Sequence, residues 1–243
     1  MQAMKAVAIC KWAMNPQDER LDSEGNIKWH AKRPEAGDDD FAAVGVAEVC
    51  AGDQDVYGLT SASGDVAFAA ARGAAETYTY DDIPVDAQPQ EVAATLAAAV
   101  RALGDVDVVS IGDSEWNPAV PGLLAGMLGI PAILAVDSVQ LDGDGLLVTR
   151  RFGPGTQDIH VGTPVLLGVA ARREEESKPG MRTVLQARKK PVTKLEELAV
   201  TAPTAQQIDA HAPDSAPAKV FDGADPDAAV SQLIKALQTE GVL

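Results

Sequence analysis

The stretch of sequence that decides the fold runs from Val108 to Pro131 and reads VVSIGDSEWNPAVPGLLAGMLGIP. Its first five residues are typical of a buried strand, and residues 121–129 are typical of a helix. Between them lies a polar loop that contains two acidic residues, an asparagine, a tryptophan and two prolines. In open α/β sheets, ligands bind at the carboxyl ends of the strands, where this loop stands.

The same order of strand and helix recurs about four times in the first 140 residues. Apolar runs predict strands, and alanine-rich segments with apolar residues at helical spacing predict helices. The predicted strands cover 4–10, 55–61, 77–80, 105–112 and 131–139, and the predicted helices cover 39–50, 66–76, 89–103 and 121–129. Residues 12–32 are a polar excursion with a turn or small hairpin over 22–29. The alternation predicts a parallel α/β sheet with helices on both faces, and right-handed crossovers limit it to a Rossmann-like layout.

After Ser138 the pattern changes. Strand-like flanks around Asp-Gly-Asp-Gly at 142–145 predict a hairpin, with a third strand over 156–161 and an apolar strand over 163–170. A charged stretch broken by Pro179, Gly180 and Pro191 leads to an extended Ala-, Pro- and Thr-rich arm and an amphipathic helix at the end. We therefore expect a Rossmann-like domain over residues 1–182 and a C-terminal arm with a terminal helix over residues 183–243.

Composition excludes several functional classes. The formal net charge of −16 and the pI near 4.5 argue against nucleic-acid binding, because phosphate backbones are repelled by an acidic surface. Cys10 and Cys50 are too few for a disulfide framework or a four-cysteine metal site. No apolar run reaches the length of about 18 residues that a membrane span needs, and the amino terminus reads as a strand rather than as a secretory signal. A cytoplasmic location is the expectation.

The common catalytic motifs are missing from this sequence. We find no phosphate-binding G-x-x-x-x-G-K-[ST], no G-x-G-x-x-G after the first strand, no G-x-S-x-G and no H-E-x-x-H. The three histidines lie far apart, and His160 is expected in or beside a strand in a structural role. Cys10 reads as a small buried side chain rather than as a reactive thiol. The acidic run 38–40 reads as a solvated helix start.

Four segments carry a resemblance to the beta subunit of electron-transfer flavoproteins. They are VAICK at 7–11, AARGAAETYTY at 70–80, SIGDSEWNPAVPGLLAGMLGIPA at 110–132, and TPVLLGVA at 163–170 followed by ARREEESKPGMRTVLQARKKPV. Together they span Met4 to about Leu198, in the order and spacing of that family. The nucleotide loop departs from the family's pattern. Ala119 stands at the family's glutamine position and Pro121 at its glycine position, while Val120 stands at the position that has threonine or valine.

The resemblance implies an electron carrier rather than an enzyme with its own catalytic side chains. It implies an adenine-nucleotide alpha-hydrolase-like fold and a heterodimer with an alpha subunit, which holds most of an FAD. That FAD passes electrons from a flavoprotein dehydrogenase to a further acceptor. The resemblance places dehydrogenase contacts at Lys178, Met181 and Arg182. It implies that the C-terminal arm lies across the alpha subunit, although a flexible tail is the alternative reading of the arm.

The resemblance also implies a nucleotide at the predicted strand ends, either AMP or a second FAD. The candidate residues for binding it are Ala8, Ile9, Cys10, Ser61, Ser63, Gly112, Asp113, Asn117, Val120 and Gly122. Glycine at 112 lets a ligand approach the backbone, and the amides at the start of the helix at Val120 and Gly122 suit a phosphate. Asp113 and Glu115 oppose a phosphate unless they point away or bind ribose hydroxyls.

Two other readings stay open. In one, the loop at 113–121 is a plain connector in which Trp116 packs on a neighbour. In the other, the chain is a stand-alone adenine-nucleotide-binding regulatory protein of the same fold, which works without flavin or partner. A small hydrolase or ligase is a weaker third reading, because the catalytic motifs are missing.

Overall fold

The computed structural model describes residues 4–24, 26–30, 33–85, 87–113, 116–171, 175–202 and 218–242. The chain divides into two compact units, residues 1–208 and residues 209–243, which are described separately below. The first unit holds the sheet and all but one of the described helices.

A nine-stranded sheet forms the centre of the first unit, in the order β11-β10-β9-β12-β8-β1-β6-β7-β13. Its strands are β1 (Ala6–Ile9), β6 (Val56–Ser61), β7 (Glu76–Tyr80), β8 (Val108–Gly112), β9 (Ala132–Asp142), β10 (Gly145–Phe152), β11 (Gly155–Val161), β12 (Val165–Val169) and β13 (Val192–Lys194). Across the sheet, the seven strands in the order β9-β12-β8-β1-β6-β7-β13 pair in parallel, whereas β9–β10 and β10–β11 are antiparallel. The predicted α/β class and the predicted hairpin insertion are confirmed.

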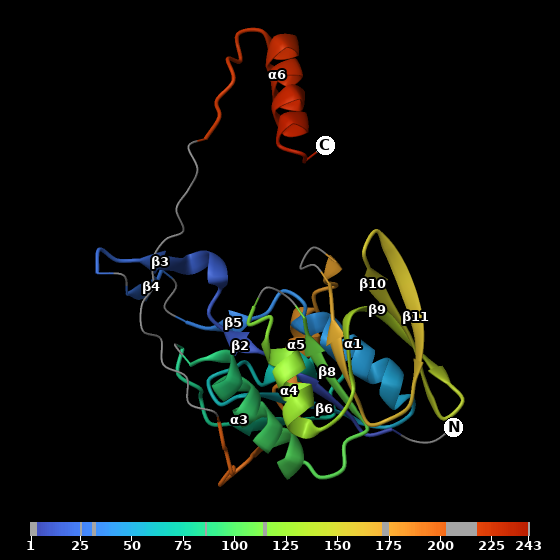
Figure 1. The fold of residues 1–243 in the computed structure, drawn as a ribbon. Coiled ribbons are helices and arrows are strands. Elements are labelled where there is room, and N and C mark those ends of the chain that lie inside the picture. The colour runs from blue at the N-terminus through green and yellow to red at the C-terminus, as the bar shows by residue number, and fades with distance from the viewer. Residues whose placement is uncertain are drawn as a thin grey trace. The chain divides into compact units, whose positions relative to one another are not determined.

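Helices cover both faces of the sheet, as Figure 1 shows. On one face lie α1 (Asp40–Ala51) and the short α2 (Ala67–Ala70), and on the other lie α3 (Pro89–Ala102) and α4 (Val120–Leu128). The central strands β1, β8 and β12 are buried along their whole length, which explains their continuous apolar sequence. The buried face of α3 is mostly alanine, and such small side chains let a helix pack close to the sheet.

Local sequence sets the ends of the helices. Pro89 is the first residue of α3, and the side chain of Glu91 accepts a hydrogen bond from the Gln88 amide to complete a capping box. Gly129 ends α4 in the left-handed conformation with φ 73°, which glycine adopts without steric cost.

One predicted helix is much shorter than expected. The helix predicted over 66–76 is limited to the four residues of α2. Gly73 follows with φ 125°, a backbone conformation closed to most side chains, and a Cβ there would meet the Glu48 side chain. The chain then turns into β7, because the Ala74 amide bonds back to the Ala69 carbonyl.

The arm was expected to begin at residue 183, but the sheet continues beyond this point. The short helix α5 (Met181–Ala187) spans that position, and β13 then pairs with β7 as the last strand of the sheet. Leu195 and Leu198 pack against the same core as α3 and α4. The stretch 183–202 therefore belongs to the sheet domain in this structure.

Smaller elements complete the first unit. A two-stranded pair joins β2 (Trp12–Ala13) to β5 (Glu35–Ala36), and the short helix η1 (Pro16–Asp18) follows β2. A second pair joins β3 (Glu19–Leu21) to β4 (Ile27–Trp29), which confirms the hairpin predicted in this region. No described helix is both long and apolar enough to cross a membrane.

The second unit contains α6 (Pro226–Thr239), the predicted terminal helix. Its first turn is capped by Asp225, whose carboxylate accepts a hydrogen bond from the Ala228 amide at 3.2 Å. Val230, Leu233 and Ile234 are exposed on this helix, so its apolar side chains are not buried within the described chain.

Candidate functional site

The carboxyl ends of β8, β1 and β6 lie level with one another at one edge of the sheet. Ile9 of β1 is paired with Leu59 on one side and with Ile111 on the other. The three chain segments that follow these strands therefore meet, as the sequence predicted, and the long loop before α4 begins here. This strand-end edge is the position at which open α/β sheets bind ligands.

The first group of predicted residues lies at this edge but is largely inaccessible. Ala8, Ile9 and Cys10 are buried, and the Cys10 amide donates to the Leu59 carbonyl at 2.9 Å. Burial raises the pKa of the Cys10 thiol well above its ordinary value, so the thiol is a buried, unreactive group. Only the backbone of these residues can border a ligand.

The end of β6 turns sharply through the two predicted serines. The side chain of Ser61 is buried, whereas Ser63 is exposed. The Ser63 amide donates to the Asp82 carboxylate at 2.8 Å, and Gly64 bonds back to the Ser61 carbonyl at 3.0 Å. The Ser63 hydroxyl is thus presented at the edge of the sheet by a turn that is fixed at both ends.

Gly112 is needed for close approach, but the approaching group is a side chain of this chain. A Cβ at this position would lie 2.0 Å from Oδ1 of Asp39. Asp113 follows, and its Oδ2 accepts a hydrogen bond from the Ala135 amide at 2.7 Å. Asp113 therefore faces β9. Its carboxylate is turned away from the loop in which a phosphate was considered.

The remaining predicted residues lie where α4 begins. Asn117 has φ 55°, and its carbonyl accepts a hydrogen bond from the Val120 amide at 3.0 Å. Val120 is buried and Gly122 is exposed. The Val120 amide is thus already used within the chain, and Glu115 lies outside the described residues. Gly122 is the position here that remains accessible from solvent.

Sequence reasoning missed a buried charged cluster of Lys11, Asp39 and Asp40 beside these residues. All three side chains are buried, so the prediction of a solvated helix start at 38–40 is wrong for Asp39 and Asp40. Lys11 Nζ donates to the Trp116 carbonyl at 2.8 Å, and Asp40 Oδ2 accepts from the Gly37 amide at 3.0 Å. The start of α1 is buried because it packs against the ends of β1 and β8.

Burial controls the electrostatics of this cluster. Removal from water raises the pKa of Asp40 to about 7, although the nearby Lys11 works in the opposite direction. Burial likewise lowers the pKa of Lys11, against the attraction of Asp40, Asp39 and Asp113. Tyr80 also has a raised pKa, again chiefly because it is buried. Three buried titratable side chains with shifted pKa values, Lys11, Asp40 and Tyr80, therefore lie in this part of the domain.

These groups define which ligand chemistry fits the strand-end edge. Within the described structure, Asp40 Oδ1 and the hydroxyls of Thr60 and Ser110 are buried without a hydrogen-bond partner. Carboxylate and hydroxyl oxygens suit the donors of ribose hydroxyls or of an adenine amino group. The buried carboxylates of Asp39 and Asp40 would repel a phosphate placed beside Gly112. The exposed start of α4 is a better place for a phosphate. The residues fit a nucleoside better than a phosphate.

The predicted partner residues Lys178, Met181 and Arg182 lie together at α5, on a different part of the domain. Met181 is 76% exposed, and Leu185 on the same helix is also exposed. Residues 177–194 contain six basic residues and no acidic residue, in a chain whose net charge is −16. The segment combines exposed apolar side chains with a local positive charge.

This segment is held firmly on the domain. Lys190 Nζ donates to the carbonyls of Ala70 and Ala74 at 3.0 and 2.6 Å, and Ala187 is buried against α2. Arg72 forms an ion pair with Glu176, which precedes α5. The exposed face of α5 is therefore presented in a fixed position.

Among the described residues, no group of three or more histidine, cysteine or acidic side chains is placed to hold a metal ion. His160 lies in β11, as predicted, and pairs with Asp142 on the exposed face of the hairpin.

A comparison with protein families found a match over most of the chain. The family model described as "Electron transfer flavoprotein domain" matches residues 30–200. The match covers well over half of the chain and includes α1, the loop before α4 and the α5 segment.

Proposed function

Because the chain belongs to the electron transfer flavoprotein domain family, whose members are electron carriers rather than catalysts, we propose that it is the beta-type subunit of a heterodimer. In this proposal it pairs with an alpha subunit, which holds most of an FAD. The heterodimer accepts electrons from a flavoprotein dehydrogenase and passes them to a further acceptor. The FAD supplies the redox chemistry when bound, and the protein supplies position and electrostatics.

The observation that carries the proposal is the exposed and firmly held face of α5. Met181 and Leu185 present apolar surface that nothing in the described chain covers, and Arg182 adds charge beside them. Exposed apolar side chains with a charged surround favour recognition of another protein. An acidic patch on the dehydrogenase would be guided to this basic segment and away from the remaining, acidic surface.

The strand-end edge supports a nucleotide-binding role in which the nucleoside and the phosphate lie at different ends of the site. Ser61, Ser63 and the backbone of residues 8–10 would border the nucleoside, and Gly122 at the start of α4 would border a phosphate. Asn117 shapes the loop between them through its left-handed backbone. AMP and the AMP half of a second FAD both have these parts, so both remain candidates.

The exposed face of α6 supports a further contact with the alpha subunit. Val230, Leu233 and Ile234 lie at helical spacing, as in helices that place an apolar face in a partner's groove. Leu233→Asp should weaken heterodimer formation about tenfold or more, since it places a charge in an apolar contact. Val242→Asp, outside the helix, is the matched control. Equal affinity for both variants would remove α6 from the interface.

Co-expression with the alpha subunit tests the proposal as a whole. The purified complex should be yellow, with flavin and AMP counted per heterodimer by absorbance and by chromatography of the released nucleotides. Met181→Ser should lower the rate of electron acceptance from the dehydrogenase without changing flavin content, and Val49→Ser on α1 is the control. A stable complex without flavin, or a chain that binds ATP or AMP but forms no complex with an alpha subunit, would overturn the proposal.

A further inference from the structure

A cleft of about 710 Å³ lies beside the carboxyl end of β7, and one of its lining residues, Asp82, accepts a hydrogen bond from the amide of Ser63 at the neighbouring end of β6. Three segments form it: the chain that follows β7, the first turns of α3, and the stretch after β13. Its lining comprises Asp81, Asp82, Ile83, Pro84, Ala87, Glu91, Thr95, Glu197, Leu198, Val200 and Ala202. Clefts of this volume are typical of sites that take a drug-sized group or a short stretch of peptide.

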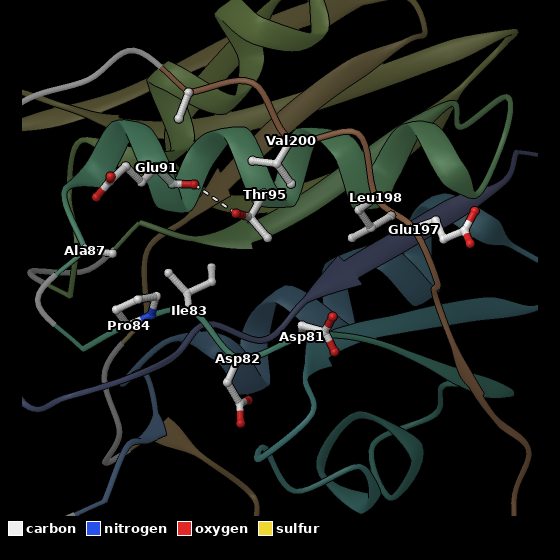
Figure 2. Close-up of a pocket in the computed structure, with 11 residues that line it drawn as sticks. Asp81, Asp82, Ile83, Pro84, Ala87, Glu91, Thr95, Glu197, Leu198 and Val200 are labelled. Atoms are coloured by element: carbon white, nitrogen blue, oxygen red, sulfur yellow. Dashed lines mark hydrogen bonds between the residues drawn. The ribbon is translucent and has the colours of Figure 1, made fainter.

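The cleft has an apolar centre and an acidic margin. In Figure 2 the side chains of Ile83, Leu198 and Val200 are directed towards its middle. The carboxylates of Asp82 and Glu197 extend from the middle towards the edges in the same view. An occupant that matches this pattern has hydrocarbon at its centre and polar groups at its ends.

The charge of the margin is negative and is not neutralised by the lining. Four carboxylates contribute to the cleft, and none of the described residues that line it is basic. Asp82 and Glu91 each accept a hydrogen bond from a backbone amide at 2.8 Å, which leaves their negative charge in place. Lys194 pairs with Asp81 at 3.1 Å from outside the lining, so at most one of the four charges is offset.

This charge selects the kind of occupant. A phosphate or a carboxylate would be repelled by the margin, although the amino end of α3 lies beside it. A lysine or arginine would be attracted, and its aliphatic stem would suit the apolar centre. The chemistry of the cleft is thus complementary to a basic, apolar segment of polypeptide.

We propose that this cleft receives a basic segment with apolar side chains from the partner subunit. The inference rests on the proposed function, because the heterodimer supplies the partner. Electrostatic complementarity of this kind fixes the register of two proteins and speeds their association. The cleft would then serve assembly, while the α5 face remains free for the dehydrogenase.

A matched pair of charge reversals tests the cleft in the full chain. Glu197→Lys, an exposed lining residue, should weaken heterodimer formation by about three- to tenfold, as expected for reversing one exposed charge contact. Asp53→Lys changes the net charge equally, but it lies just before β6 at the opposite edge of the sheet. Ala87→Trp, which fills the cleft without changing charge, should also weaken assembly. Circular dichroism confirms that each variant is folded.

Hydrogen–deuterium exchange locates the contact directly. Residues 81–85 and 197–202 should exchange more slowly in the purified heterodimer than in the isolated chain. A yellow heterodimer with unchanged exchange there, or with equal affinity for Glu197→Lys and Asp53→Lys, would overturn the cleft assignment and leave the proposed function standing. A co-expressed chain that yields no flavin-containing complex would overturn the proposed function, and the occupant of the cleft with it.

Discussion

Replacement of Asp40 by asparagine should make the protein more stable at neutral and alkaline pH. Asp40 is buried beside Lys11, and its burial raises its pKa from 3.8 to about 7. The amide oxygen of asparagine can still accept the hydrogen bond that Gly37 donates to Oδ2. Asp40→Asn therefore removes the cost of burying a charge and keeps the local geometry.

The magnitude follows from linkage between protonation and folding. The folded protein holds the Asp40 proton more tightly than the unfolded chain does, so the stability falls as the pH rises from about 4 and levels off above about 7. At about 1.4 kcal/mol for each tenfold change in proton affinity, the full cost is about 4 kcal/mol. Between pH 5.5 and 8, the advantage of the asparagine variant should grow by about 2 kcal/mol.

Urea unfolding of the full chain measures this difference at several pH values above the pI of 4.5, where the protein carries net charge. Tryptophan fluorescence is a suitable probe, because Trp116 is buried and its carbonyl accepts the Lys11 hydrogen bond. Asp53→Asn, in an exposed turn, is the control. A stability difference that does not change with pH would show that attraction to Lys11 balances burial, and an asparagine variant that is less stable at pH 8 would show that attraction outweighs burial.

Two further substitutions test the packing around the two predicted sites. Gly112→Ala should destabilise the fold by about 2 kcal/mol or more, because the new Cβ would collide with the buried Asp39 carboxylate. Gly122→Ala is the control and should be neutral or slightly stabilising, because there is open space around this position. Equal melting temperatures for the two variants would refute this account. Lys190→Ala should cost about 1–3 kcal/mol by removing its hydrogen bonds to the carbonyls of Ala70, at the end of α2, and Ala74. The variant should also make the α5 segment more sensitive to limited proteolysis. Lys189→Ala is the control, and identical cleavage rates would contradict the role given to Lys190.

Most of the central sheet could be predicted from local sequence. Largely apolar runs gave β1, β8 and β12, since a strand buried on both faces needs apolar residues along most of its length. The Asp-Gly-Asp-Gly signal gave the β9–β10 hairpin because it reports the conformation of the turn directly. The helix predicted over 66–76 was too long, because close approach of the Glu48 side chain to Gly73 helps to end α2 early. The short helix α5 was not predicted.

The end of the first unit could not be predicted in the same way. The three residues of β13 have no strong pattern, and they become a strand only because β7 offers a free edge. The cleft was missed for a related reason, because residues 81–95 and residues 197–202 are far apart in the sequence and meet only in the folded chain.

The sequence by itself determined the α/β class, the order of the strands along the chain and the meeting of three strand ends, because local periodicity and parallel topology dictate these features. Only the tertiary structure decided that Asp39 and Asp40 lie buried with Lys11, and that Gly112 makes room for a carboxylate. The same acidic residues at the start of a helix are solvated or buried according to what packs on them. That depends on contacts across the sheet, which no local pattern records.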